Sequence, residues 1–91
     1  NHEMVEDNLR FRPEEKERIQ RLLMVEKKVP DFGKKLDHCG YADGFKAYFA
    51  DGSFLICRFS GTEPLLRIFA EDENAPAAAR LIAVMKDFLK L

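Results

Sequence analysis

The sequence predicts an α+β fold of one antiparallel sheet with two helices on one face, in the order β-α-β-β-β-β-α. Two Asp-Gly pairs, at 43–44 and 51–52, are flanked by aromatic and apolar residues, which is a strong hairpin signal. Residues 45–49 alternate between apolar and polar side chains, as a half-buried strand does. Residues 78–89 carry apolar side chains at helical spacing. The 91-residue length fits a single domain, residues 1–91.

The first strand and the first helix are expected near the N-terminus. Residues 2–11 mix apolar and acidic side chains and are compatible with a short strand. A helix is predicted over residues 13–27, because proline suits its first turn and two glutamates suit its positive N-terminal end. Its apolar positions recur at helical spacing: Ile19, Leu22 and Leu23. Pro30 then disfavours helix at the preceding residue, so a loop is expected.

Three strands should follow as an antiparallel meander, over residues 36–41, 45–50 and 53–59. In the middle strand one face is expected to be core and the opposite face to carry Lys46 and Tyr48. The core side chains of that strand are Phe45, Ala47 and Phe49. The two Asp-Gly pairs are expected to be the turns of this meander.

A fourth consecutive strand is predicted over residues 65–71, where apolar side chains alternate with Arg67 and Phe69. A closing helix should begin after Asn74, which is a plausible N-cap, with Pro76 in its first turn. Its apolar stripe predicts that it covers the sheet: Ala78, Leu81, Ile82, Met85, Phe88 and Leu89.

Charge and composition argue against several classes of function. Lys and Arg total 15 against 16 Asp and Glu, so the positive field of a nucleic-acid binder is missing. No apolar run is long enough to cross a bilayer and no signal peptide opens the sequence, so a cytoplasmic protein without membrane contact is expected. Cys39 and Cys57 are expected to be free thiols. Together with His2 and His38 they lack the close spacing typical of metal ligands, so no metal site is predicted.

Residues 58–64, Arg-Phe-Ser-Gly-Thr-Glu-Pro, have the composition of an anion-binding loop. Arg58 offers a planar guanidinium that can bind two phosphate oxygens, and Ser60 and Thr62 offer hydroxyl donors. Gly61 favours the tight turn of a backbone anion nest. This loop is expected to be exposed at one end of the sheet. The alternative is an ordinary strand connection, with Arg58 paired to Glu63 or Glu71 at the surface.

Residues 58–71 resemble the phosphate-binding loop and the following strand of the α-D-phosphohexomutases, the phosphoglucomutase/phosphomannomutase family. The resemblance extends back through residues 43–46 and 51–57 and forward into the closing helix, whereas the first forty residues match only in general layout. Members of this family have four domains. The resemblance therefore implies the last domain, which has a TATA-box-binding-protein-like fold.

The family interconverts hexose 1-phosphates and 6-phosphates through a bisphosphate, using a phosphoserine and Mg²⁺ bound in the earlier domains. The last domain holds the phosphate that is not reacting. By resemblance this role falls to Arg58, Ser60, Gly61 and Thr62. Arg67 is a weaker candidate, on the ground that its side chain can point to the sheet face opposite Arg58.

This sequence departs from the family pattern in three ways. Phe59 stands where many members have proline, and the Ser-His-Asn stretch of the phosphoserine is absent, since Ser53 and Ser60 are followed by other residues. The carboxylate cluster that holds Mg²⁺ is also absent. We therefore expect no catalytic residue and no metal ligand here, with Mg²⁺ in another domain of a mutase that is an enzyme only as a whole. The expected partners are a glucose or mannose phosphate and the other domains of the same polypeptide.

The alternative function is a stand-alone module that binds phosphate or nucleic acid. Fold likeness alone is weak support for it. The preferred hexose, the oligomeric state and the role of Glu63 stay open at the level of the sequence.

Overall fold

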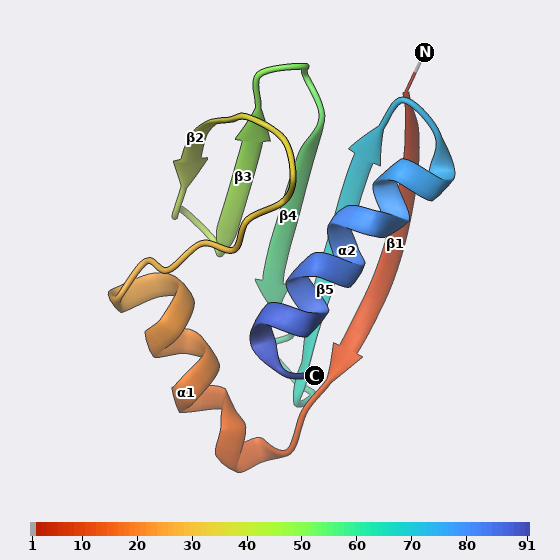
Figure 1. Ribbon diagram of the computed structural model, residues 1–91. Helices are drawn as coiled ribbons and strands as arrows, with labels where there is room; N and C mark the ends of the chain where they lie inside the picture. The colour runs from red at the N-terminus through yellow and green to blue at the C-terminus, as the bar shows by residue number, and fades with distance from the viewer. Residues whose placement is uncertain (1) are drawn as a thin grey trace.

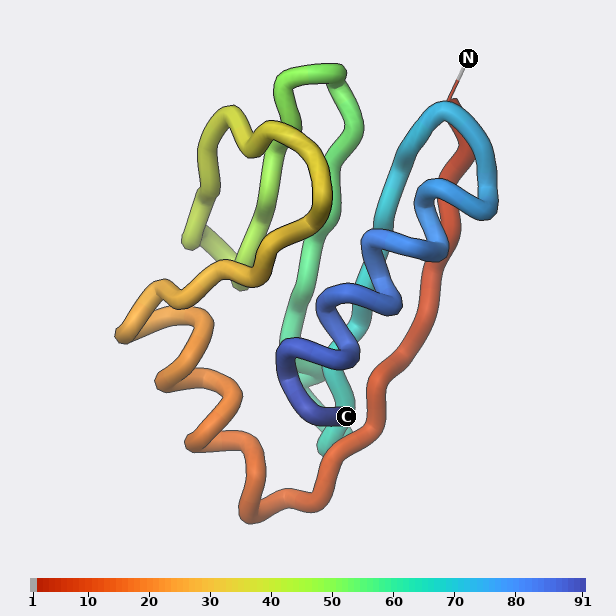
Figure 2. Tube along the Cα trace, viewed as in Figure 1, coloured from red at the N-terminus to blue at the C-terminus, as the bar shows by residue number. Residues whose placement is uncertain are grey.

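The computed structural model describes residues 2–91 as a five-stranded antiparallel sheet with helical segments packed against it (Figure 1). The strands lie in the order β1-β5-β4-β3-β2, so the first strand of the chain pairs with the last (Figure 2). Their bounds are β1 Glu3–Arg10, β2 Leu36–Gly40, β3 Phe45–Phe49, β4 Phe54–Phe59 and β5 Leu65–Asp72. The α+β fold and the element order predicted from the sequence are confirmed.

Both Asp-Gly pairs lie in hairpin turns, as predicted. In the β3–β4 turn the N–H of Phe49 donates to the carbonyl of Ser53 (2.9 Å), and Gly52 has a φ of 91°. That geometry is typical of a three-residue hairpin loop with glycine in the left-handed region. In the β2–β3 turn, Asp43 and Gly44 both have positive φ, 58° and 117°.

The first helical segment covers the predicted span but is not one continuous α-helix. It consists of a 3-10 turn (Pro13–Glu15), α1 (Lys16–Gln20) and a π-helical turn (Arg21–Val25), and Lys27 with a φ of 54° ends it. The N–H of Glu26 donates to the carbonyl of Arg21, five residues back, at 2.8 Å. Apolar spacing predicts a helical face but does not distinguish α from π turns.

The core lies between the helices and one face of the sheet. α2 (Ala75–Leu89) packs on β5 and β1, and its N-cap is the predicted one, because the Asn74 side chain accepts the N–H of Ala77 at 2.8 Å. The first helical segment contributes Ile19 and Leu23, which are 0% and 1% exposed, to the same buried cluster. The predicted alternation in β3 is confirmed. The core side chains that the strands contribute include Phe45, Ala47, Phe49, Leu55, Cys57, Leu66, Ile68 and Ala70.

A network of charged side chains around Lys34 lies at the end of the sheet where β5 ends. The Lys34 ammonium donates to Asp51 (2.7 Å), Asp72 (2.8 Å) and the hydroxyl of Ser53 (3.0 Å). Hydrogen bonds from Lys34 and Ser53 hold the pKa of Asp51 far below its usual range. Burial alone would lower the pKa of Lys34, but its bonds to Asp51 and Asp72 raise it. The loop after the first helical segment is thereby tied to the β3–β4 hairpin and to β5.

Cys39 and Cys57 are both free thiols, as the sequence predicts. Burial raises the pKa of each thiol, and Cys57 is 1% exposed. Within residues 2–91, no helix has the length and apolarity needed to span a membrane.

Candidate phosphate-binding site

Arg58 and Arg67 are direct cross-strand partners in the β4–β5 ladder. Partners in an antiparallel ladder project from the same face of a sheet, so both side chains lie on the face that the helices leave uncovered. Both residues are exposed, whereas their neighbours Cys57, Leu66 and Ile68 are buried in the core. The expectation that Arg67 can point to the opposite face is therefore wrong. The register between β4 and β5 determines that the two side chains share a face, and the sequence of a single strand does not reveal that register.

Neither arginine forms an ion pair with a carboxylate among residues 2–91. The two acids proposed as surface partners of Arg58 pair elsewhere: Glu63 lies 3.8 Å from Arg10, and Glu71 lies 3.4 Å from His2. The alternative that Arg58 is neutralised by either acid is therefore wrong. Two like charges placed opposite each other in a sheet destabilise it by a few tenths of a kcal/mol to about 1 kcal/mol. An anion bound between them would remove that repulsion.

Ser60 lies at the start of the loop that joins β4 to β5 and is only 9% exposed. Its hydroxyl oxygen accepts the N–H of Thr62 (3.3 Å) and of Glu63 (3.2 Å). The prediction that the whole loop is exposed is wrong at Ser60, because this side chain caps the turn from inside. A hydroxyl has one donor and two acceptor positions, so the bond left to Ser60 is donation of its proton.

Gly61 and Thr62 form the exposed tip of the loop. Gly61 does not have a positive φ, so its backbone conformation is open to other residues. Apart from Gly61 and its two chain neighbours, no atom of residues 2–91 lies within 4 Å of the position that a Cβ at Gly61 would take. The contribution of this glycine is therefore open space beside the loop backbone rather than an unusual turn.

The end of the loop is attached to β1. The N–H of Phe11 donates to the carbonyl of Pro64 (3.1 Å), and Glu63 faces Arg10 from the neighbouring strand. Within the loop, Leu65 N–H donates to the carbonyl of Glu63 (2.8 Å), and Ser60 N–H donates to the carbonyl of Leu65 (3.0 Å). These bonds hold the loop backbone in a defined conformation. Glu63 itself faces Arg10 and is not one of the candidate phosphate donors.

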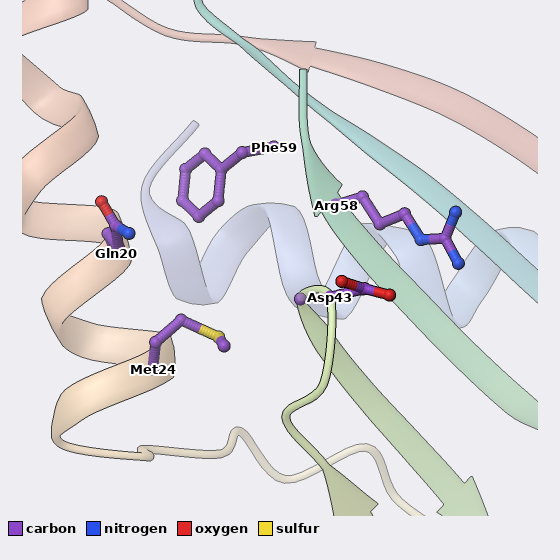
Figure 3. Close-up of a pocket in the computed structure, with 6 residues that line it drawn as sticks. Gln20, Met24, Asp43, Arg58 and Phe59 are labelled. Atoms are coloured by element: carbon purple, nitrogen blue, oxygen red, sulfur yellow. The ribbon is translucent and has the colours of Figure 1, made fainter. Parts of the chain in front are cut away.

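A pocket of about 420 Å³ lies beside Arg58, between the first helical segment and the β2–β3 turn (Figure 3). Gln20 and Met24 approach it from the helical side, and the Phe59 ring lies between that helical segment and β4 in this view. Met24 belongs to the π-helical turn, a feature that is frequent at functional sites. No sequence pattern indicated a role for Gln20 or Met24. The remaining lining residues are Asp43, Gly44, Arg58 and Phe59.

At Gly44 the β2–β3 turn packs closely on β4, against the backbone of Cys57 and Arg58. A Cβ added at Gly44 would lie 2.2 Å from the carbonyl oxygen of Cys57 and 3.4 Å from the Cα of Arg58. Only glycine allows this approach, and its φ of 117° is also a conformation that favours glycine. The sequence predicted a turn here but not its contact with the arginine.

These groups together can bind an anion by charge-assisted hydrogen bonds. Arg58 and Arg67 supply positive charge from two strands, Ser60 supplies a hydroxyl donor, and Gly61 leaves the loop backbone accessible. Among residues 2–91, no group of three or more His, Cys, Asp and Glu side chains is placed to hold a metal ion. The residues described do not fit Mg²⁺, and no step is assigned to a metal in this chain.

Comparison with known proteins identifies the family of the chain. A search of curated proteins found no match. The family described as "Phosphoglucomutase/phosphomannomutase, C-terminal domain" matches residues 8–87. This range includes the whole candidate site, all of β2 to β5 and the last residues of β1, 8–10. The chain therefore belongs to the phosphoglucomutase/phosphomannomutase C-terminal domain family.

Proposed function

We propose that this domain binds the non-reacting phosphate of a hexose phosphate within a mutase that interconverts hexose 1-phosphate and hexose 6-phosphate. The observation that carries the proposal is the exposed pair Arg58 and Arg67, which face the same side of the sheet without carboxylate partners in the described residues. A phosphate dianion carries the negative charge that would neutralise these two arginines. Arg58 can also bind two phosphate oxygens with its planar donor fork.

The loop completes the proposed site. Because N–H groups of Thr62 and Glu63 fill both acceptor positions of the Ser60 hydroxyl, the interaction left to this largely buried group is donation of its proton, and we propose that a phosphate oxygen accepts it. Thr62 and the backbone at Gly61 add donors at the exposed tip. Each charge-assisted bond contributes about 1.5–3 kcal/mol before the cost of association. We expect a dissociation constant near 1 mM for free phosphate, from a few such bonds in an exposed site.

The chemical step is proposed to lie outside this chain. The family's phosphoserine and its Mg²⁺ are expected in other domains of the same polypeptide, so the enzyme is a phosphoglucomutase or phosphomannomutase only as a whole. Glucose and mannose phosphates share the group that this loop would bind, so the preferred sugar is assigned to those other domains. A cytoplasmic location and the absence of nucleic-acid or membrane partners belong to the same proposal.

A chemical-shift titration of the domain with glucose 6-phosphate tests the proposal. The backbone signals of Ser60, Gly61 and Thr62 and the side-chain signal of Arg58 should move together and fit one dissociation constant. Glucose at the same concentrations is the matched control, because it lacks the phosphate. Equal shifts with glucose, or phosphate-dependent shifts confined to the opposite end of the sheet, would reject the site.

A further inference from the structure

Asp43 lies beside the candidate phosphate ligand Arg58 and has no role in the site described so far. It is exposed, lines the same pocket as Arg58, and forms no hydrogen bond or ion pair with its side chain among residues 2–91. In Figure 3 the carboxylate of Asp43 points toward the side on which the Arg58 guanidinium lies. Asp43 and Arg58 thus carry opposite charges at neighbouring positions, and neither forms an ion pair among residues 2–91.

The backbone holds Asp43 in this place. Gly44 approaches β4 so closely that an added Cβ would lie 2.2 Å from the Cys57 carbonyl oxygen, so the turn packs directly on the strand beside Arg58. Asp43 itself has a φ of 58°, a left-handed conformation that aspartate and asparagine tolerate better than most residues. The close packing of Gly44 on β4 therefore holds the backbone of the neighbouring Asp43 next to the strand that carries Arg58.

A guanidinium has five N–H donors in one plane, and a bidentate phosphate uses two of them. If the remaining donors have no partner, the guanidinium plane of the exposed Arg58 is free to rotate about its side-chain bonds. A carboxylate that accepts one of those donors fixes the direction of the fork, in the way that outer carboxylates orient the ligands of a bound ion.

We infer that Asp43 is a positioning residue for Arg58: its carboxylate accepts a guanidinium N–H of Arg58 while the fork binds phosphate. This inference rests on the proposed function. Asp43 does not touch the phosphate in this arrangement, and its own charge repels the anion. The two effects have opposite signs, which makes the inference easy to test.

The experiment titrates inorganic phosphate into the 91-residue domain and its variants, following backbone amides and the Arg58 Nε–H signal by NMR. Asp43→Asn is the main variant, because asparagine keeps the left-handed turn and removes only the charge. Asp43→Gly removes the side chain without backbone strain and guards against a misfolded result. Glu73→Gln is the control, since Glu73 is an exposed acid after the far end of β5 whose side chain forms no hydrogen bond or ion pair among the described residues.

If Asp43 positions Arg58, Asp43→Asn and Asp43→Gly should weaken phosphate binding about threefold to tenfold, the equivalent of one modest hydrogen bond. The Arg58 Nε–H signal, slowed in solvent exchange by phosphate in the wild type, should stay in fast exchange in both variants. In an Arg58→Ala background, Asp43→Asn should have no further weakening effect. Glu73→Gln should bind phosphate as the wild type does or slightly more tightly.

Tighter binding by Asp43→Asn would overturn the inference, because charge repulsion would then be the only role of Asp43. An unchanged affinity with a normal Arg58 Nε–H response would overturn it as well. Either result leaves the phosphate site itself in place. If the wild-type domain shows no phosphate binding that depends on Arg58, the proposed function fails and this inference fails with it.

Discussion

Arg58 and Arg67 lie opposite each other on neighbouring strands, and neither is neutralised by a carboxylate of the described residues. By contrast, the Lys34 ammonium at the other end of the sheet is paired with Asp51 and Asp72. The arginine pair thus places two positive charges opposite each other on neighbouring strands, without an ion-pair partner among residues 2–91. This arrangement favours an anionic ligand over a purely structural role.

Arg58→Ala should weaken phosphate binding more than Arg67→Ala, because Arg58 also lines the pocket beside the β2–β3 turn and Arg67 does not. Arg58→Lys should also weaken binding, since an ammonium cannot reproduce the bidentate fork. Phosphate titrations followed by NMR measure all three variants under the same conditions. If Arg58→Ala keeps the wild-type affinity while Arg67→Ala abolishes binding, Arg67 is the principal ligand and the assignment must be reversed.

Without phosphate, Arg67→Ala should leave the domain as stable as the wild type or raise its unfolding free energy by up to about 1 kcal/mol. The substitution removes the cross-strand repulsion, which has that magnitude at most. Thermal unfolding in phosphate-free, low-salt buffer measures it. Arg80→Ala is a suitable control because Arg80 lies on the exposed side of α2 and forms no ion pair among residues 2–91. A clear loss of stability in Arg67→Ala would show that the arginine packs usefully and is not strained by its partner.

Gly44→Ala should lower the unfolding free energy by about 2–4 kcal/mol, because a methyl group would meet the Cys57 carbonyl and the left-handed φ would be strained. Chemical denaturation gives this value. Gly61→Ala is the matched control: its φ is ordinary and its Cβ would meet no atom within 4 Å, so its stability should stay within about 0.5 kcal/mol of the wild type. Equal stability of the two variants would contradict the described contact between the β2–β3 turn and β4.

The Lys34 network predicts a loss of stability in acid. The pKa of Asp51 is lowered in the folded state, so its stabilising effect is present above the unfolded-state value of about 4 and is lost as the pH falls below it. Urea unfolding between pH 7 and pH 2 should show this loss in the wild type and a flatter profile in Lys34→Met. At pH 7, Lys34→Met should also be less stable, because Asp72 would stay buried without its cation.

Lys35→Met serves as the control for that experiment, because the neighbouring Lys35 is exposed and its side chain forms no ion pair among residues 2–91. Its pH profile should follow the wild type. Identical profiles for Lys34→Met and the wild type would mean that the network does not contribute to the acid transition.

The domain alone should show no conversion of glucose 1-phosphate to glucose 6-phosphate with Mg²⁺ and a bisphosphate activator. The proposal assigns the phosphoserine and the metal to other domains, so no group here donates the phosphoryl group. A complete phosphoglucomutase in the same assay is the positive control. Turnover by the domain that disappears in Arg58→Ala would contradict the prediction, whereas a contaminant would be unaffected by that substitution.

The sequence predicted the strands well because period-two alternation and the Asp-Gly turns act locally, as Phe45, Ala47 and Phe49 show. It predicted the candidate loop through residue types, but not the burial of Ser60, which depends on hydrogen bonds within the folded turn. The shared face of Arg58 and Arg67 depends on the register between two strands, and the placement of Asp43 depends on Gly44 meeting β4. Such features arise from pairing and packing, which local patterns do not encode.

The attachment of the loop to β1 bears on the order in which the domain folds. The strands from β2 to β5 are joined by short turns, so they can pair early, whereas the first helical segment and all of β2 to β4 separate β1 from its partner β5 along the chain. The bond between Phe11 and Pro64 can form only when β1 has docked. We therefore expect the loop to reach its final shape late in folding, so that phosphate slows unfolding of the native domain without accelerating its refolding.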